Sequence, residues 1–247
     1  MALPFADFDV EAYAQDTSDH VTSYQSDRGA IVKTLVNAQP LEETPFIAPF
    51  VACPNATAKQ AMQFADIHPG DVIMDLGCGN GQLMRAAVQH LLDIKCKMTP
   101  ENSFVQSKVI GIELDPYLAD HVRQLISSET DLQVWLALNG KLGLESKEDD
   151  SVVLDRCIQV RILEQDIFTV DLELWKPTVL VLYLLPEGLR RLQPQLMQWL
   201  ITSDGRRLVT IDYAVPDWQP QSTEPLNSGT GTKHLYLYTR SDLHINR

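Results

Sequence analysis

Short apolar runs alternate with amphipathic stretches along most of the chain. The runs have the length of buried strands, and they fall at 71–75, 109–114, 157–163, 178–184, 207–213 and 234–238. Between them, apolar residues recur at helical spacing, as at Leu83, Ala87 and Leu91. A second stripe of this kind consists of Leu189, Leu192, Leu196 and Leu200. The alternation predicts an α/β fold in which strands are joined through helices and therefore pair in parallel.

The ends of this pattern differ from its centre. Residues 1–45 are polar and acidic, which predicts an extension, partly helical or disordered, ahead of a domain at 46–247. The stretch 127–155 has weak periodicity and an acidic cluster, so we expect an exposed inserted loop there. We expect Asn55 or Thr57 to cap a helix over 58–66. The last two strands are expected to form an antiparallel hairpin at the C-terminal edge of a doubly wound, mostly parallel sheet.

Composition narrows the classes of partner. The 247 residues include 33 acidic and 20 basic side chains, for a formal charge of −13. This balance disfavours a nucleic-acid partner and suits a basic partner or a cationic cofactor, although it serves solubility equally well. The four cysteines have no C-x-x-C spacing, so no metal site or disulfide framework is expected. We find no apolar window that predicts a membrane span and no basic leader, so we expect a cytoplasmic location.

The first predicted strand leads into a glycine-rich turn. The turn contains Asp75, Gly77, Cys78, Gly79 and Gly81, and a helical pattern follows it. Glycines let the backbone approach a ligand closely, and the helix N-terminus offers N–H groups to a carboxylate or phosphate. The spacing D-x-G-x-G-x-G lacks the lysine of a P-loop and differs from the dinucleotide motif. Because Asp75 would repel a pyrophosphate and suits an ammonium group, the turn predicts the methionine part of S-adenosylmethionine as ligand.

The letters D-L-G-C-G-N-G resemble the first motif of the seven-β-strand, class I S-adenosylmethionine-dependent methyltransferases. The resemblance implies a Rossmann-like sheet of seven strands. Glu113 ends the second predicted strand, where an acid of a doubly wound sheet reaches ribose hydroxyls. Asp115 is the competing acid and ranks second. After the third strand, Asp166 and Ile167 resemble the family's adenine element, in which the acid accepts the exocyclic amine and the apolar residue packs on the ring.

The fourth strand ends in L-Y-L-L-P, at the place that faces the methyl group in this fold. Many amine methyltransferases carry N-P-P-Y or D-P-P-Y there, so adenine and glutamine-amide methylation are disfavoured. Tyr183 and Glu187 are the polar groups left near the mouth of the expected methyl-transfer site, and we predict them as the catalytic candidates. Tyr183 fits equally well as a core aromatic with a hydrated hydroxyl. Methyl transfer mainly requires that an unprotonated nucleophile be positioned about 3 Å from the methyl.

A wider set of segments is similar to the lysine methyltransferases that act on the adenine nucleotide translocase and the ATP synthase c-subunit. These segments are TPFIAPFVACP, DLGCGNG, GIEL, LYLLPEGLRRLQPQL and VPDWQP, and the similarity covers roughly residues 45–238. It implies protein-lysine methylation, and the acidic balance of the chain agrees with a basic protein substrate. We expect segment 46–54 to close over the cofactor. The chain departs from the mitochondrial members by its acidic extension and its longer loop at 127–155. The resemblance therefore does not carry over their substrate or location.

Two alternatives stay open at this point. A small-molecule methyltransferase would use the same cofactor site with an enclosed apolar pocket. A non-catalytic S-adenosylmethionine-binding partner protein would bind without transfer, which the absence of a polar strand-four motif permits. An NAD-dependent dehydrogenase fits less well, because Gly81 falls one residue early for the dinucleotide motif.

Overall fold

A computed structural model of the chain describes residues 51–95, 106–128, 151–154, 158–227 and 233–242. The chain divides into two units, Met1–Pro49 and Phe50–Arg247, and every described residue belongs to the second unit. The extension expected at 1–45 and most of the loop expected at 127–155 lie outside the described residues. The domain boundary at residue 46 stays a prediction.

A mixed sheet forms the centre of the second unit. Its strands are β1 (Val72–Leu76), β2 (Ser107–Glu113), β3 (Ser151–Leu154), β4 (Ile158–Glu164), β5 (Val179–Leu182), β6 (Arg207–Ile211), β7 (Ser222–Pro225) and β8 (His234–Tyr238). They lie in the order β3-β4-β2-β1-β5-β6-β8-β7, parallel from β4 to β6 and antiparallel at both sides. The order reverses beside β1, and ligands of doubly wound sheets bind at such a switch point, outside the carboxyl ends of the strands. The predicted fold class is thereby confirmed, and the described residues form eight strands where the resemblance implied seven.

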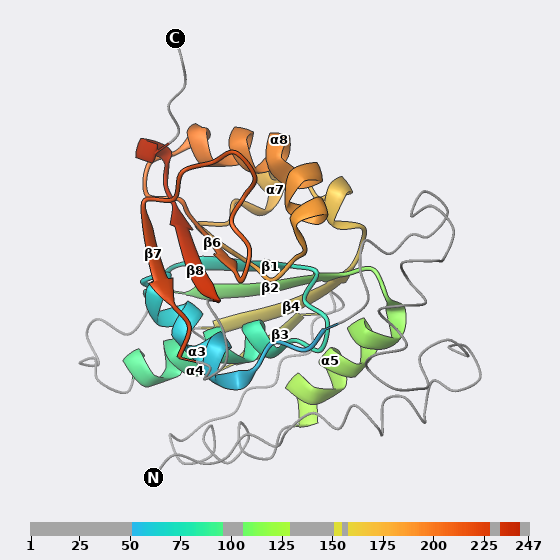
Figure 1. The fold of residues 1–247 in the computed structure, drawn as a ribbon. Helices are drawn as coiled ribbons and strands as arrows, with labels where there is room; N and C mark the ends of the chain where they lie inside the picture. The colour runs from blue at the N-terminus through green and yellow to red at the C-terminus, as the bar shows by residue number, and fades with distance from the viewer. Residues whose placement is uncertain (1–50, 96–105, 129–150, 155–157, 228–232, 243–247) are drawn as a thin grey trace, which may run out of the picture. The chain divides into compact units, whose positions relative to one another are not determined.

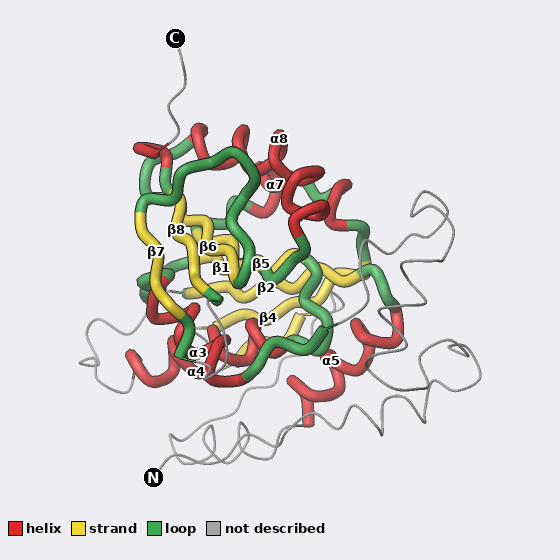
Figure 2. Tube along the Cα trace, viewed as in Figure 1, coloured by secondary structure: helices red, strands yellow, loops and turns green. Residues whose placement is uncertain are grey.

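Helices cover both faces of this sheet (Figures 1 and 2). One face carries α3 (Asn55–Phe64), α4 (Gln82–Lys95) and α5 (Pro116–Ser128), and the other carries α7 (Leu172–Trp175) and α8 (Pro186–Thr202). Two short 3-10 helices, η3 (Ile167–Thr169) and η4 (Arg240–Asp242), complete the described elements. Both predicted apolar stripes are buried against the sheet, those of α4 and of α8. The helical periodicity therefore identified the faces that build the core.

Three local predictions need correction. Residues 151–154, expected in an exposed loop, form β3 and pair antiparallel with β4. Residues 222–225, expected in a polar loop, form β7, so β8 lies between β6 and β7 and the sheet edge is one strand further out. Both are short edge strands, and β7 is largely exposed, so it lacks the apolar alternation by which a strand is recognised. Helix α3 begins after Pro54 with no side-chain cap, rather than behind Asn55 or Thr57.

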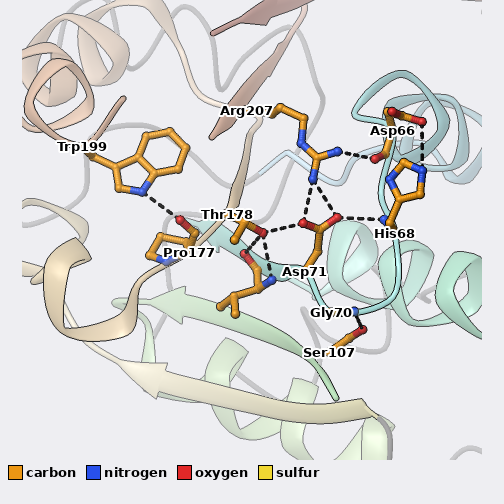
Figure 3. Close-up of polar contacts among 10 residues, drawn as sticks. Asp66, His68, Gly70, Asp71, Ser107, Pro177, Thr178, Trp199 and Arg207 are labelled. Atoms are coloured by element: carbon orange, nitrogen blue, oxygen red, sulfur yellow. Dashed lines mark hydrogen bonds and ion pairs between the residues drawn. The ribbon is translucent and has the colours of Figure 1, made fainter. Parts of the chain in front are cut away.

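The amino edge of the sheet, where β1, β5 and β6 begin, is held by a polar cluster around Asp71 (Figure 3). Arg207 donates to both carboxylate oxygens of Asp71 at 2.7 Å, and Thr178 Oγ1 donates to one of them at 2.6 Å. The backbone N–H of His68 adds a fourth hydrogen bond at 2.8 Å. Trp199 of α8 donates its indole N–H to the carbonyl of Pro177, just before β5. One buried carboxylate thus joins the starts of three strands.

Candidate functional site

The glycine-rich turn leaves the carboxyl edge of the sheet, where β1, β2, β5 and β6 end. Gly77, Gly79 and Gly81 all have left-handed backbones, with φ of 83°, 52° and 73°. The N–H groups of Gly77 and Cys78 both donate to the carbonyl of Ile112, which ties the turn to the end of β2. A Cβ at Gly81 would lie 2.7 Å from Cγ1 of Val122 on α5, so only glycine fits between the turn and that helix.

Asp75 lies at the centre of this edge and is 3% exposed. Neither carboxylate oxygen has a hydrogen-bond partner among the described residues. Burial raises the pKa of Asp75 well above its ordinary value, and the nearby Glu113 raises it further. Burying an unpaired carboxylate is costly, so a donor from outside the chain would relieve the cost. The residue is therefore suited to receive a cationic group.

Glu113, at the end of β2, contacts the same turn. Its Oε2 accepts the N–H of Gly79 at 2.7 Å, and its Oε1 accepts those of Leu114 and Asp115 at 2.8 and 3.0 Å. The structure thus brings together the two acids that the sequence predicted. A carboxylate has about four lone-pair sites, so roughly one remains for a ligand hydroxyl. Asp115, the competing acid, accepts the N–H of Tyr117 at the start of α5 and acts as a helix cap.

The end of β4 adds the predicted pair Asp166 and Ile167. The backbone of Gln165 donates to the carbonyl of Glu113 at 2.9 Å, which places this turn beside the end of β2. Asp166 is half-buried and accepts the N–H of Phe168 at 3.0 Å, so one oxygen caps η3. Ile167 is buried. The pair therefore lies on the same edge as Asp75 and Glu113, one strand further out.

The two predicted catalytic residues follow β5 and differ in their surroundings. Tyr183 is half-buried and packs against the core, and burial raises the pKa of its hydroxyl. Glu187 is exposed on the first turn of α8, with Arg190 at 3.9 Å. A Cβ at Gly77 would lie 3.2 Å from Leu184, so the glycine turn closely approaches the chain after β5. The structure places the turn next to the L-Y-L-L-P segment.

The sequence analysis did not predict one polar pair on this edge, Asp212 with Lys233. Asp212 follows the end of β6, and its Oδ2 accepts the Lys233 ammonium at 2.5 Å. Cys53 is buried with its pKa raised to about 12, an effect of burial that Asp75 increases and Lys233 opposes. Cys53 lies in the segment 46–54 expected to close over the cofactor; residues 46–50 lie outside the described residues. The sequence shows that Asp212 follows a predicted strand, but it does not show that Lys233 pairs with it.

The two segments that carry the wider resemblance contact each other. Gln193 on α8 donates to the carbonyl of Pro216 at 2.6 Å. Trp218 packs edge-on against Tyr238 of β8, with ring centroids 5.8 Å apart. The tryptophan and proline of VPDWQP therefore fix the loop after β6 to α8 and β8. Within the described residues, no group of side chains suits a metal ion, and no helix is long and apolar enough to cross a membrane.

Comparisons with known proteins agree on the fold. No family model matches the sequence. A protein-lysine N-methyltransferase from Saccharolobus islandicus is 22% identical over 190 residues, covering 77% of this chain and 92% of that protein. The crystal structure of an RNA methyltransferase from Salinibacter ruber, in complex with S-adenosyl-L-homocysteine, is similar with a TM-score of 0.53 and 24% identity. That match covers 76% of this chain and 93% of the other.

A weaker structural match is the magnesium protoporphyrin IX methyltransferase from Synechocystis with bound S-adenosylmethionine. It has a TM-score of 0.46 and 12% identity, covers 87% of this chain and 97% of the other, and adds no support by itself. The chain therefore has the fold of the class I methyltransferases, and in sequence it resembles a protein-lysine N-methyltransferase. The resemblance predicted from DLGCGNG and the strand-four segment is confirmed at this level.

Proposed function

We propose that this chain is an S-adenosylmethionine-dependent methyltransferase whose substrate is the side-chain amine of a protein lysine. The observation that carries the cofactor is Asp75, a buried carboxylate with both oxygens unpaired among the described residues. It lies beside a left-handed glycine turn at the switch point of the sheet. The methionine end of the cofactor carries an ammonium group. Its positive charge complements the carboxylate, and its N–H groups supply the donors that Asp75 lacks.

The cofactor's parts are assigned along the carboxyl edge in the order of the strands. Asp75 and the turn formed by Gly77, Cys78, Gly79 and Gly81 would hold the methionine end. Glu113 would accept a ribose hydroxyl at its remaining lone-pair site while keeping its backbone donors. The second oxygen of Asp166 would accept the adenine amine, and Ile167 would line the ring's site. The positions of the residues along this edge support these assignments.

The bound cofactor supplies a methyl group activated by a sulfonium. The protein then has to bring an unprotonated lysine amine to that methyl and exclude water from the approach. Tyr183 lies after β5, next in the chain to Leu184, which closely approaches the glycine turn, and we assign its hydroxyl to orient the amine. A raised pKa keeps this hydroxyl protonated at neutral pH, so it can donate or accept a hydrogen bond. Glu187, exposed on α8, is assigned to accept the proton that the lysine loses.

A protein-lysine substrate is supported by three observations. The relative from Saccharolobus islandicus is a protein-lysine N-methyltransferase and aligns with most of the chain. The β5 end carries L-Y-L-L-P in place of the N-P-P-Y of adenine and amide methylation. The charge of −13 suits a basic protein and disfavours RNA, the substrate class of the solved relative from Salinibacter ruber.

Tritiated-methyl labelling of a dialysed cell lysate tests the proposal. We expect label in protein, and we expect its loss when lysate amines are acetylated with acetic anhydride beforehand. Asp75→Asn serves as the variant that should label more weakly at limiting cofactor, and Asp66→Asn, at the opposite edge, as the matched variant that should label normally. Label confined to RNA or to small molecules would contradict the lysine substrate. Binding of S-adenosylhomocysteine without transfer to any fraction would support the non-catalytic alternative.

A further inference from the structure

Asp212 and Lys233 form an ion pair at the carboxyl edge, one strand beyond Tyr183. Leu182 of β5 pairs with Thr210 of β6, so Tyr183 and Asp212 follow neighbouring strand ends. The side chain of Asp212 is 12% exposed, whereas that of Lys233 is 47% exposed. The carboxylate is therefore fixed within the edge, and the ammonium reaches it from the solvent side.

The turn that carries Asp212 is held in an unusual conformation. Asp212 has φ of 72°, in the left-handed region that costs an L-residue roughly 1–2 kcal/mol. Its N–H donates to the carbonyl of His234 at 2.8 Å, and Thr210 Oγ1 donates to the carbonyl of Tyr213 at 2.7 Å. Strain of this kind persists where the surroundings over-determine it, often at functional sites. Here it aims a carboxylate at an ammonium.

The pair is electrostatically connected to the candidate site. The Lys233 ammonium opposes the rise of the Tyr183 pKa that burial causes, and Asp212 adds to that rise. Lys233 also opposes the rise of the Cys53 pKa, whereas Asp75 increases it. Lys233 therefore lies within the field of the same side chains that surround the proposed methyl-transfer site. Its amine is the chemical group that we propose as the substrate.

A purely structural role is the competing explanation, because the pair also closes one end of the β6–β8 ladder. The opposite end of that ladder carries a second ion pair, Arg240 with Asp204 at 3.1 Å. That pair is exposed, at 49% and 88%, and lies at the amino end of β6, away from Asp75. The two pairs thus offer a matched comparison within the same two strands.

We propose that Asp212 is the specificity-determining residue that receives the substrate's lysine as an ammonium, before that lysine gives its proton to Glu187 and its amine attacks the methyl, and that Lys233 occupies this position until a substrate displaces it. The inference rests on the proposed protein-lysine function. Asp212 selects for a long, flexible cation, and the displaced Lys233 returns to solvent, to which 47% of its side chain is already exposed. Asp212 acts on binding, so its removal changes the substrate concentration needed for half-saturation more than it changes the rate at saturation.

Labelling rates measured over a dilution series of lysate protein test this assignment. Asp212→Asn keeps the left-handed turn, because asparagine tolerates it, and should raise the half-saturating protein concentration about tenfold. Lys233→Met removes the internal occupant at similar length and should lower that concentration about threefold. Asp204→Asn, the matched control, should leave it unchanged. All three variants should bind S-adenosylhomocysteine with unchanged affinity, which shows that they are folded.

The outcomes separate the two proposals. If the wild-type protein labels no protein lysine, the proposed function fails and this inference fails with it. If the wild-type protein labels lysine but Lys233→Met leaves the half-saturating concentration unchanged, Lys233 does not occupy the substrate's position. If Asp212→Asn behaves like Asp204→Asn, or lowers only the rate at saturation, Asp212 does not receive the substrate ammonium. A fall in melting temperature with unchanged half-saturation would assign the pair to the β6–β8 ladder alone.

Discussion

Asp71 and Asp75 stand at the two ends of β1, and both are buried, at 8% and 3% exposure. At the amino edge, Asp71 accepts four hydrogen bonds, two of them from Arg207. At the carboxyl edge, neither oxygen of Asp75 is paired within the described residues, and burial raises its pKa. One aspartate is satisfied by the protein itself. The other has no partner among the described residues, and we propose that a bound ligand supplies one.

The difference assigns separate tasks to the two edges. A buried charge with all its partners holds β-strands together. Removing one partner leaves the other charge buried and unpaired. A buried charge without partners weakens the folded state and stores that cost until a cation arrives. We therefore assign the same residue type on the same strand to stability at one end and propose it for binding at the other. The comparison can be tested by making the same substitution at both positions.

The largest expected effect is on stability at the amino edge. Asp71→Asn removes a charge from a bidentate pair and leaves Arg207, whose side chain is 18% exposed, without its counter-ion. We expect the free energy of unfolding to fall by about 3 kcal/mol in urea titrations, with unchanged affinity for S-adenosylhomocysteine in the folded fraction. Asp66→Asn, in the same turn but exposed, should change it by less than about 0.5 kcal/mol. Equal effects of the two variants would refute the cluster's role.

The same substitution at the carboxyl edge should reverse the outcome. Asp75→Asn removes a buried, unpaired charge, so the free energy of unfolding should stay constant or rise. The affinity for S-adenosylhomocysteine should fall by about 2 kcal/mol, roughly thirtyfold, because a charge-assisted contact to the ammonium is lost. Calorimetry and urea titration measure the two quantities on one preparation. A destabilised Asp75→Asn with normal affinity would remove the contrast between the edges.

Two glycines sharpen the comparison further. Gly81, in the turn at the carboxyl edge, and Gly205, before β6, both have left-handed backbones, with φ of 73° and 83°. A Cβ at Gly81 would meet Val122 at 2.7 Å, whereas a Cβ at Gly205 would meet nothing within 4 Å. Gly205→Ala should cost about 1 kcal/mol from backbone strain alone, and Gly81→Ala about 1–2 kcal/mol more.

The steric part of the Gly81→Ala cost can be isolated by a second change. Adding Val122→Ala to Gly81→Ala should restore part of the lost stability, although Val122→Ala alone is destabilising. The double-mutant cycle in urea measures this coupling. Additive effects would mean that the turn and α5 do not press against each other.

The smallest expected effect is a pH dependence that belongs to Asp75. Its pKa is raised from an ordinary value of 3.8, so the folded chain keeps this proton to a higher pH than the unfolded chain does. Across that window the unfolded state binds fewer protons, and the stability of the ligand-free protein should fall as pH rises. Affinity for an ammonium ligand should rise over the same range, because the carboxylate forms. Calorimetry between pH 4 and 8 should show both slopes, and Asp75→Asn should flatten them.

The carboxyl edge could be predicted from the sequence because parallel strands end together. Asp75, Glu113 and Asp166 each follow an apolar run, so their proximity required only the strand order. The structure confirms that proximity through the contact of Glu113 with Gly79 and of Gln165 with Glu113. Their roles toward the cofactor, and those of Tyr183 and Glu187 toward the substrate, stay predictions.

The amino edge and the outer strands could not be predicted in this way. Asp71 contacts residues far away in the chain, Thr178 and Arg207, and nothing in the local pattern indicates them. The pairing of Asp212 with Lys233 requires that β8 lie antiparallel beside β6, with the polar β7 outside it. Edge strands bury little surface, so their sequences carry little hydrophobic signal.

Cys78 is a natural probe of the packing of the glycine turn. Its thiol is buried, and burial, reinforced by Asp75 and Glu113, raises its pKa, so almost no reactive thiolate meets an alkylating reagent. Gly111 confirms how closely it is packed, since a Cβ there would lie 2.8 Å from the Cys78 sulfur. Alkylation at Cys78, read peptide by peptide in a mass spectrometer, therefore reports how well this turn shields the thiol. A ligand that binds at the turn should slow that alkylation.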